Sequence, residues 1–387
     1  MKKYRILFLL IPLLTTFHSQ AQVKTGAERT DLYASALRGK SMAIVANGAS
    51  MMFGSNVVDA LLSMGCNVKI IFSPEHGFRQ FSEAGQGIEN FSDPVTGIPV
   101  ISLYGNKKKP SAEDLRGIEA MVFDLQDVGV RFFTYISTLT YVMEACAENR
   151  IPLIVLDRPN PNGFYIDGPV LEPGFASYTG MHPVPIVYGM TIGEYAQMVN
   201  GEGWLTNGMK CDLRVVPLEN YTHQTLYELP VKPSPNLTNM NAVYLYPSIC
   251  LFEGTVVSPG RGTDHPFEMY GHPELFSGSY SFTPRSIPSM SLHPPFEGKQ
   301  CWGFAFLGWT AAYPEKMGKI QLSWLIDAFA ELGSKKEFFT EYFDKLAGNS
   351  SLREQILKGV NVEDIRDSWE PALQKFQVTR AKYLLYE

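Results

Sequence analysis

Residues 41–73 decide the fold class of this chain: SMAIVANGASMMFGSNVVDALLSMGCNVKIIFS. Two short apolar runs, 42–46 and 68–72, flank a longer amphipathic stretch at 57–64. Apolar runs of this length predict buried strands, and the stretch between them has the spacing of a helix. A strand–helix–strand unit of this kind is typical of a parallel sheet that is covered by helices on both faces.

The same alternation continues to residue 217. We expect further strands and helices, at 99–104, 121–125, 153–156 and 213–217 for the strands and at about 134–149 and 191–199 for the helices. Thr191 and Glu194 have the spacing of a capping box, which satisfies free amide donors at the start of a helix. The first part of the chain is therefore predicted to be an α/β domain.

The composition changes beyond this domain. Residues 231–295 are rich in Pro, Gly, Tyr and Asn, so we expect them to be mostly loop. A strand is predicted at 302–307, and several helices from about 323 to 386. We place the boundary near residue 225, which gives a first domain at 22–225 and a smaller α/β domain at 226–387. A chain of 387 residues with 45% hydrophobic content is sufficient for two cores.

The first 21 residues have the features of a secretory signal peptide. Lys2 and Lys3 precede a short apolar run, and Ser19 and Ala21 are small residues at the minus three and minus one positions of a cleavage site. The run is too short to span the roughly 30 Å hydrocarbon core of a bilayer. We therefore expect an exported protein, periplasmic or extracellular, without stable membrane insertion.

The cysteines and the net charge limit the kinds of covalent bridge, metal site and partner that we expect. Five widely spaced cysteines fit neither a dense disulfide framework nor a CxxC zinc site, so we expect buried thiols, with a single bridge as the alternative. A net charge of -6 argues against nucleic acid as a partner. A small neutral or mildly charged substrate is the simpler expectation.

Polar side chains gather just after the predicted strands. Ligands of an open parallel sheet bind beyond the carboxyl ends of its strands, so these residues are the candidates for a site. They are Asn47, Glu75, His76, Asp124, Asp127, Asp157, Arg158 and Asn160. The three aspartates also have a structural interpretation, as helix caps or as partners of Arg131 and Arg158. Glu75 is the strongest candidate for a reacting group, because it lies between Pro74 and His76 in a constrained loop.

The motifs of several enzyme classes are absent from the sequence. It has no GxGxxG, Walker-type, HExxH or GxSxG pattern, so we expect no cofactor and no metal, with a three-histidine site across loops as the alternative. Carboxylates with hydroxyl and aromatic neighbours remain, and hydrolysis of a glycosidic bond needs little else. Side chains that could stack on a sugar are Tyr104, Phe132, Phe133, Tyr135, Tyr188 and Tyr246.

Long stretches of the chain resemble the NamZ-like exo-β-N-acetylmuramidases, a bacterial family. They are SPEHGFR at 73–79, VFDLQDVGVRFFTYIST at 122–138, LDRPNP at 156–161, DGPVL at 167–171, YGMT at 188–191, PSPN at 233–236, CLFEGT at 250–255 and SPGRGT at 258–263. The resemblance implies a Rossmann-like N-terminal domain, a smaller α/β second domain, and a cleft between them for a terminal β-1,4-linked N-acetylmuramic acid.

The resemblance also implies roles for individual residues. Glu75 falls on the family's proposed catalytic glutamate, and we expect it to protonate the glycosidic oxygen, with Asp124 or Asp127 orienting the site. Arg131 and Arg261 are expected to bind the lactyl carboxylate of muramic acid, because a guanidinium pairs bidentately with a carboxylate. The other expected substrate-binding residues are Asn47, His76, Arg79, Tyr135, Asp157, Arg158, Asn160, Asn236 and Glu253.

Two questions stay open at the level of sequence. The second catalytic group could be an aspartate or the substrate's own 2-acetamido group. A binding protein for cell-wall fragments, without hydrolytic activity, is the main alternative function, and an esterase or amidase is disfavoured by the missing nucleophile motif. The expected substrates are saccharides such as MurNAc-GlcNAc and related muramyl glycosides.

Overall fold

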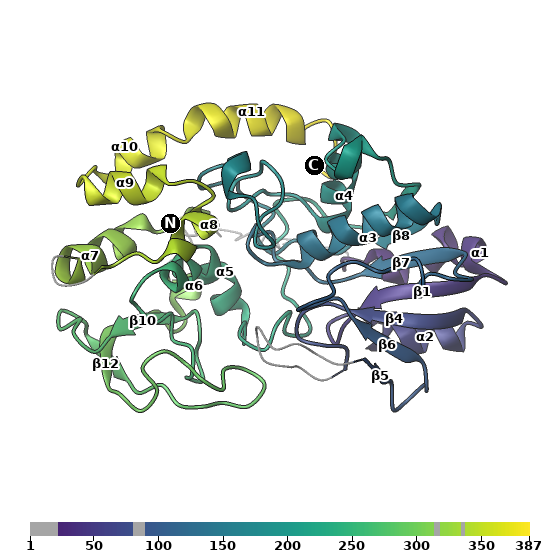
Figure 1. The fold of residues 1–387 in the computed structure, drawn as a ribbon, viewed down its shortest axis with the longest axis horizontal. Coiled ribbons are helices and arrows are strands. Elements are labelled where there is room, and N and C mark those ends of the chain that lie inside the picture. Colours follow the sequence, from purple (N-terminus) through teal and green to yellow (C-terminus); the bar gives the residue numbers. More distant parts are fainter. Residues whose placement is uncertain (1–21, 80–89, 313–317, 334–336) are drawn as a thin grey trace, which may run out of the picture.

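The computed structural model describes residues 22–79, 90–312, 318–333 and 337–387 (Figure 1). The predicted signal peptide, residues 1–21, lies outside the described residues. Over the ranges just given, no helix combines the length and the hydropathy that crossing a membrane requires. All five cysteines are buried free thiols, as expected from their spacing.

A central sheet organises the first domain. Its strands are, in spatial order, β5 (Phe91–Ser92), β6 (Pro99–Ser102), β4 (Asn67–Ser73), β1 (Ser41–Ala46), β7 (Ala120–Asp124), β8 (Leu153–Leu156) and β9 (Leu213–Val216). β5 pairs antiparallel with β6, and every other neighbouring pair is parallel. The α/β class with a mainly parallel sheet, predicted from the sequence, is confirmed.

Both faces of this sheet are covered by helices. They are α1 (Ala34–Leu37), α2 (Val57–Ser63), α3 (Tyr135–Asn149) and α4 (Ile192–Glu202). Met42 and Ile44 of β1 pack with α1 and α2 on one face, whereas Ala43 and Val45 pack with α3 and α4 on the other. Because both faces are buried, β1 is apolar at consecutive positions rather than at alternating ones. A small hairpin of β2 (Met51–Met52) and β3 (Ser55–Asn56) connects β1 to α2.

The second domain combines a small antiparallel sheet with helices. Its elements are α5 (Met240–Ile249), the 3-10 helix η5 (Cys250–Gly254), β10 (Met269–His272), β11 (Tyr280–Phe282), β12 (Cys301–Ala305), α6 (Trp309–Ala312), α7 (Leu322–Leu332), α8 (Glu341–Ala347), α9 (Ser351–Leu357), α10 (Val362–Asp367) and α11 (Glu370–Arg380). The sheet order is β10-β12-β11. The predicted smaller second domain is therefore confirmed, while the boundary near residue 225 stays a prediction.

The expectation of loop at 231–295 was wrong at α5. This helix begins at Met240, and the side chain of its N-cap residue Asn239 accepts a hydrogen bond from the amide of Ala242 at 3.0 Å. Pro247 inside the helix and the neighbouring Tyr and Asn residues have the composition of a loop. Burial of Val243, Leu245 and Ile249 in the common core overrides that local preference.

The end of the chain returns to the first domain. In Figure 1, α11 runs over the top of the molecule from the second domain towards α4, and the C-terminus lies beside α4. The Tyr386 hydroxyl donates to the buried Asp157 carboxylate at 2.6 Å, and Arg366 of α10 binds Asp167 at 2.8 Å. These contacts join the two domains on the side opposite the small antiparallel sheet.

Candidate active site

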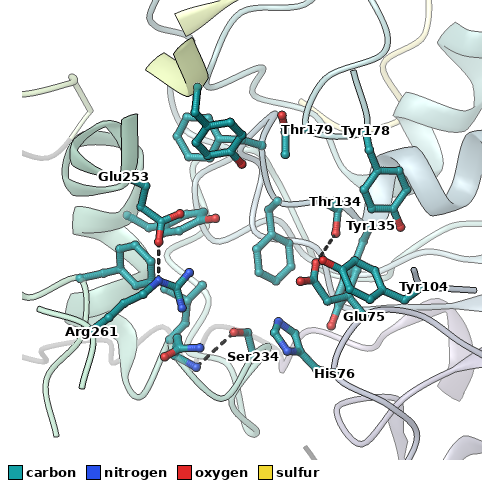
Figure 2. Close-up of a pocket in the computed structure, with 17 residues that line it drawn as sticks. Glu75, His76, Tyr104, Thr134, Tyr135, Tyr178, Thr179, Ser234, Glu253 and Arg261 are labelled. Atoms are coloured by element: carbon teal, nitrogen blue, oxygen red, sulfur yellow. Dashed lines mark hydrogen bonds and ion pairs between the residues drawn. The ribbon is translucent and has the colours of Figure 1, made fainter. Parts of the chain in front are cut away.

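A pocket lies where the two domains meet (Figure 2). One wall comes from the loop after β4 and the start of α3, and the other from η5 and the loop that follows it. The lining residues are Glu75, His76, Tyr104, Phe132, Phe133, Thr134, Tyr135, Tyr178, Thr179, Ser234, Asn236, Leu237, Tyr246, Glu253, Arg261, Phe267 and Tyr342. A concave pocket between two domains, with aromatic walls and a few polar groups, is a usual place for a small ligand.

The loop that carries Glu75 is a tight turn directly after β4. His76 has a φ of 74° and Gly77 a φ of 84°, and the Gly77 amide donates to the Pro74 carbonyl at 3.2 Å. A histidine in the left-handed region is strained, and such residues cluster at functional sites. The turn holds the half-buried Glu75 side chain against the pocket.

Two hydroxyl groups contact the Glu75 carboxyl group. Thr134 is the N-cap residue of α3, yet its hydroxyl makes no capping bond and instead donates to Oε2 of Glu75 at 3.0 Å. The Tyr104 hydroxyl also hydrogen-bonds to Glu75. Burial, together with the nearby Glu75 charge, raises the pKa of Tyr104 above its ordinary value, so this phenol stays protonated and acts as the donor.

The opposite wall carries an ion pair. Figure 2 shows Glu253 and Arg261 across the pocket from Glu75, with Nε of Arg261 donating to Oε1 of Glu253. The Arg261 guanidinium also lies 5.1 Å from the centre of the Phe267 ring. Both charged side chains are about one-fifth exposed, so the pair is open to a ligand in the pocket.

Aromatic rings form much of the remaining surface. Tyr246 packs edge-on against Phe132 at 5.4 Å and against Phe267 at 4.9 Å, and Phe133 packs edge-on against Tyr135 at 4.7 Å. Aromatic faces and edges of this kind suit the apolar face of a sugar ring. Of the six aromatic residues expected to stack on a sugar, Tyr188 alone does not line the pocket; it is buried against Asp127.

The structure brings six of the predicted site residues together at this pocket. They are Glu75, His76, Tyr135, Asn236, Glu253 and Arg261. Asn47 lies behind them and donates to the Tyr135 hydroxyl at 2.8 Å, so it orients a pocket residue without lining the pocket. The sequence reasoning missed Thr134, Tyr178, Thr179, Ser234 and Tyr342. Thr134 lies within the quoted motif 122–138, at a loop-to-helix junction, so the sequence held a local signal for it. Tyr178 and Tyr342 lie in none of the quoted motifs.

The expected catalytic aspartates lie elsewhere. Asp124 is fully buried and forms an ion pair with Arg158, at 2.6 Å from Oδ1 to Nε. Asp127 accepts hydrogen bonds from the Gly129 amide at 2.7 Å and from the Tyr188 hydroxyl, and burial raises its pKa to about 6. Neither carboxylate lines the pocket, so the geometry gives both an internal structural role.

Four expected substrate ligands are also bound to other protein groups outside the pocket. Arg79 is bound between Asp59 and Asp93, each at 2.7 Å. Asp157 accepts from the Tyr386 and Thr191 hydroxyls, and burial raises its pKa to about 7. The remaining two are Arg158, paired with Asp124, and Asn160, which donates to the Met190 carbonyl at 2.8 Å. These side chains fix loops behind the pocket, so we no longer expect them to bind substrate.

Arg131 requires the largest correction. Its side chain is completely buried, and its Nη1 and Nη2 atoms donate to four backbone carbonyls at 2.7–2.9 Å. Burial lowers the pKa of this guanidinium to about 9. Two of the acceptors, Leu346 and Ala347, belong to α8 in the second domain. Arg131 therefore ties the domains together and does not reach a ligand in the pocket.

The described part of the chain contains no cluster of three or more His, Cys, Asp or Glu residues that could hold a metal ion. The chemistry available at the pocket is that of carboxyl, hydroxyl, guanidinium, imidazole, amide and aromatic groups. One carboxyl group lies on each wall, Glu75 on one and the Arg261-paired Glu253 on the other.

Comparison with known proteins agrees with this architecture. The models for the N-terminal and C-terminal parts of the exo-β-N-acetylmuramidase NamZ match residues 42–241 and 244–386. The chain is 39% identical over 377 residues to the peptidoglycan β-N-acetylmuramidase NamZ of Bacillus subtilis (strain 168), covering 92% of this chain and 89% of the relative.

Solved structures are similar over the same length. A crystal structure of a DUF1343 family protein from Bacteroides fragilis NCTC 9343 matches with a TM-score of 0.87 at 45% identity, over 95% of this chain and 99% of that one. A second DUF1343 family protein from the same organism matches with a TM-score of 0.76 at 28% identity, over 94% and 99%.

Proposed function

Because the chain belongs to the exo-β-N-acetylmuramidase NamZ family, we propose that it is an exo-acting glycosidase that releases N-acetylmuramic acid from the non-reducing end of peptidoglycan fragments. The observation that carries this proposal is Glu75, held in a strained turn at a pocket with aromatic walls. The preferred substrates are MurNAc-GlcNAc and related muramyl glycosides.

Glu75 acts as the general acid of this reaction. One of its oxygens, Oε2, accepts from Thr134, and Tyr104 adds a second hydroxyl contact, so the carboxyl group is fixed in orientation before substrate binds. A positioned acid delivers its proton to the glycosidic oxygen as the bond to the anomeric carbon breaks. The residues that hold it contribute through geometry, since a small misplacement of a reacting group is costly.

We propose the substrate's own 2-acetamido oxygen as the second catalytic group. Asp124 and Asp127 are not in position for this step, because both lie behind the pocket lining in internal contacts. Attack by the acetamido group requires no second protein carboxylate, which fits a pocket whose other carboxylate is already paired with arginine.

A binding protein for cell-wall sugars is the alternative that an assay must exclude. The mature chain from Gln22 is incubated with MurNAc-GlcNAc, beside Glu75→Gln and the surface control Glu113→Gln, and free N-acetylmuramic acid is measured. We expect release by the parent and the control, and a loss of roughly 100- to 10,000-fold in the Glu75 variant. Binding without release by the folded parent protein would support the binding protein instead.

We further propose that residues 1–21 direct export to the periplasm or the extracellular space. Their charged start, short apolar run and small-residue cleavage site support this proposal. The test is to express the protein from its full reading frame and to determine its N-terminal sequence and its location. A mature protein that begins at Gln22 outside the cytoplasm is expected, and an uncleaved cytoplasmic protein would contradict it.

A further inference from the structure

The ion pair on the wall opposite Glu75 involves one of the three guanidinium nitrogens of Arg261. Glu253 binds Arg261 through Nε, and this is the only hydrogen bond of the guanidinium to another described residue. Its two terminal nitrogens, Nη1 and Nη2, therefore keep their donors available. Arg261 lines the pocket and about one-fifth of its side chain is exposed, so a ligand in the pocket can reach the guanidinium.

Glu253 is itself held in place on its far side. Its Oε2 atom accepts a weak hydrogen bond from the Cys250 thiol at 3.7 Å, and burial keeps the pKa of that thiol well above its ordinary value. The Phe267 ring lies beside the guanidinium and limits its movement. Glu253 thus fixes the rotation of Arg261 and leaves the edge with the terminal nitrogens uncovered.

The described lining of the pocket carries one side chain with a permanent positive charge. Among the described residues that line it, Arg261 is the only arginine or lysine. The face of Arg261 left open by Glu253 matches a planar carboxylate, which a guanidinium binds bidentately. Muramic acid differs from glucosamine by a lactyl ether at O3, and this ether carries a carboxylate.

We infer that Arg261, oriented by Glu253, recognises the lactyl carboxylate and thereby selects N-acetylmuramic acid over sugars that lack it. The inference rests on the proposed function and assigns a specificity residue and a positioning residue to the same site. Glu75 and Arg261 lie on opposite sides of the pocket (Figure 2), so a sugar whose glycosidic oxygen meets Glu75 can direct its O3 substituent towards Arg261. Arg131, the other arginine considered for this role, is excluded by its four backbone contacts.

The test is equilibrium binding of free sugars by calorimetry to the mature chain. The ligands are N-acetylmuramic acid, its lactyl methyl amide and N-acetylglucosamine. We expect the parent to prefer the free acid, and Arg261→Met to weaken binding of that acid about 10- to 100-fold while leaving binding of the amide unchanged. Arg261→Lys restores only part of the affinity, because a point charge replaces the planar fork.

Glu253→Gln separates positioning from catalysis. It is expected to weaken binding of the acid and raise KM for a muramyl glycoside, with little change in kcat, and Glu253→Asp to recover part of the affinity. The double variant Glu253→Gln/Arg261→Met, which leaves no unpaired charge, controls for misfolding and should bind the acid as weakly as Arg261→Met does.

Three results would overturn the inference: equal affinity of the parent for acid and amide, an equal loss for both ligands in Arg261→Met, or loss of kcat in Glu253→Gln with unchanged affinity for the acid. Each would leave the proposed function intact if the parent still releases N-acetylmuramic acid. Absence of release by the parent would instead reject the proposed function, whatever the binding data show.

Discussion

At the level of single residues, Glu75 depends on neighbours that come from separate parts of the chain. Its turn follows β4, while the two hydroxyls that contact it belong to Tyr104, after β6, and Thr134, before α3. The left-handed backbone at His76 stores strain that these contacts offset. The carboxyl group is oriented by the fold before any sugar enters.

Replacing Thr134 tests this orientation. Thr134→Val removes the hydroxyl and keeps the shape of the side chain, so we expect kcat for a muramyl glycoside to fall roughly tenfold with little change in KM. Thr140→Val is the matched control, because the Thr140 hydroxyl binds the Ile136 carbonyl of the same helix, away from the pocket. An unchanged kcat in Thr134→Val, or an equal loss in the control, would contradict the role.

At the level of elements, hydrogen bonds of Thr191 stabilise the start of α4. The Thr191 hydroxyl accepts from the Glu194 amide at 3.3 Å, and Glu194 in turn accepts from the Thr191 amide at 2.9 Å. The same hydroxyl donates to the buried Asp157 at 2.7 Å. The predicted capping box is confirmed, and the structure adds that it connects α4 to the carboxyl end of β8.

Thr191→Ala removes the hydroxyl, and with it both the cap on the Glu194 amide and the hydrogen bond to Asp157. We expect the free energy of unfolding to fall by about 2 kcal/mol, the sum of a lost cap and a lost hydrogen bond to a buried carboxyl group. Urea denaturation measures this change, and Thr191→Ser should recover most of it because it keeps the hydroxyl. Equal stabilities of the alanine and serine variants would show that the hydroxyl does not carry the effect.

At the level of the whole molecule, the cleft exists because buried contacts hold two domains together. Arg131 binds carbonyls of Pro169 and Val184 on one side and of α8 on the other. The last helix, α11, brings the C-terminus back to Asp157 in the first domain. The pocket walls are thus set by residues that lie behind them.

Arg131→Met leaves four buried carbonyls without their donor. We expect a loss of at least about 3 kcal/mol in the free energy of unfolding, together with reduced activity from a displaced second domain. Arg353→Met is the control, since the partly exposed pair of Arg353 with Asp344 contributes about 1 kcal/mol or less. Calorimetric or urea unfolding compares them, and similar small losses in both would contradict the assigned role of Arg131.

The sequence by itself determined six of the seven strands of the central sheet, the helices α2, α3 and α4, and Glu75 as the candidate acid. Strands buried on both faces must be apolar at consecutive positions, and caps and helix spacing depend on nearby residues, so β1, α3 and α4 could be predicted from local pattern. The family motifs, which are contiguous in sequence, singled out Glu75, Glu253 and Arg261.

Only the tertiary structure decided which charged groups face the pocket. Asp124, Asp127 and Arg131 lie in the same quoted motif as the pocket residue Thr134, and their direction depends on partners up to 216 residues away in sequence. A buried charge must be paired or hydrogen-bonded, and local sequence does not specify that partner. For the same reason Tyr178 and Tyr342, which join the pocket from separate loops and helices, could not be found before the chain was folded.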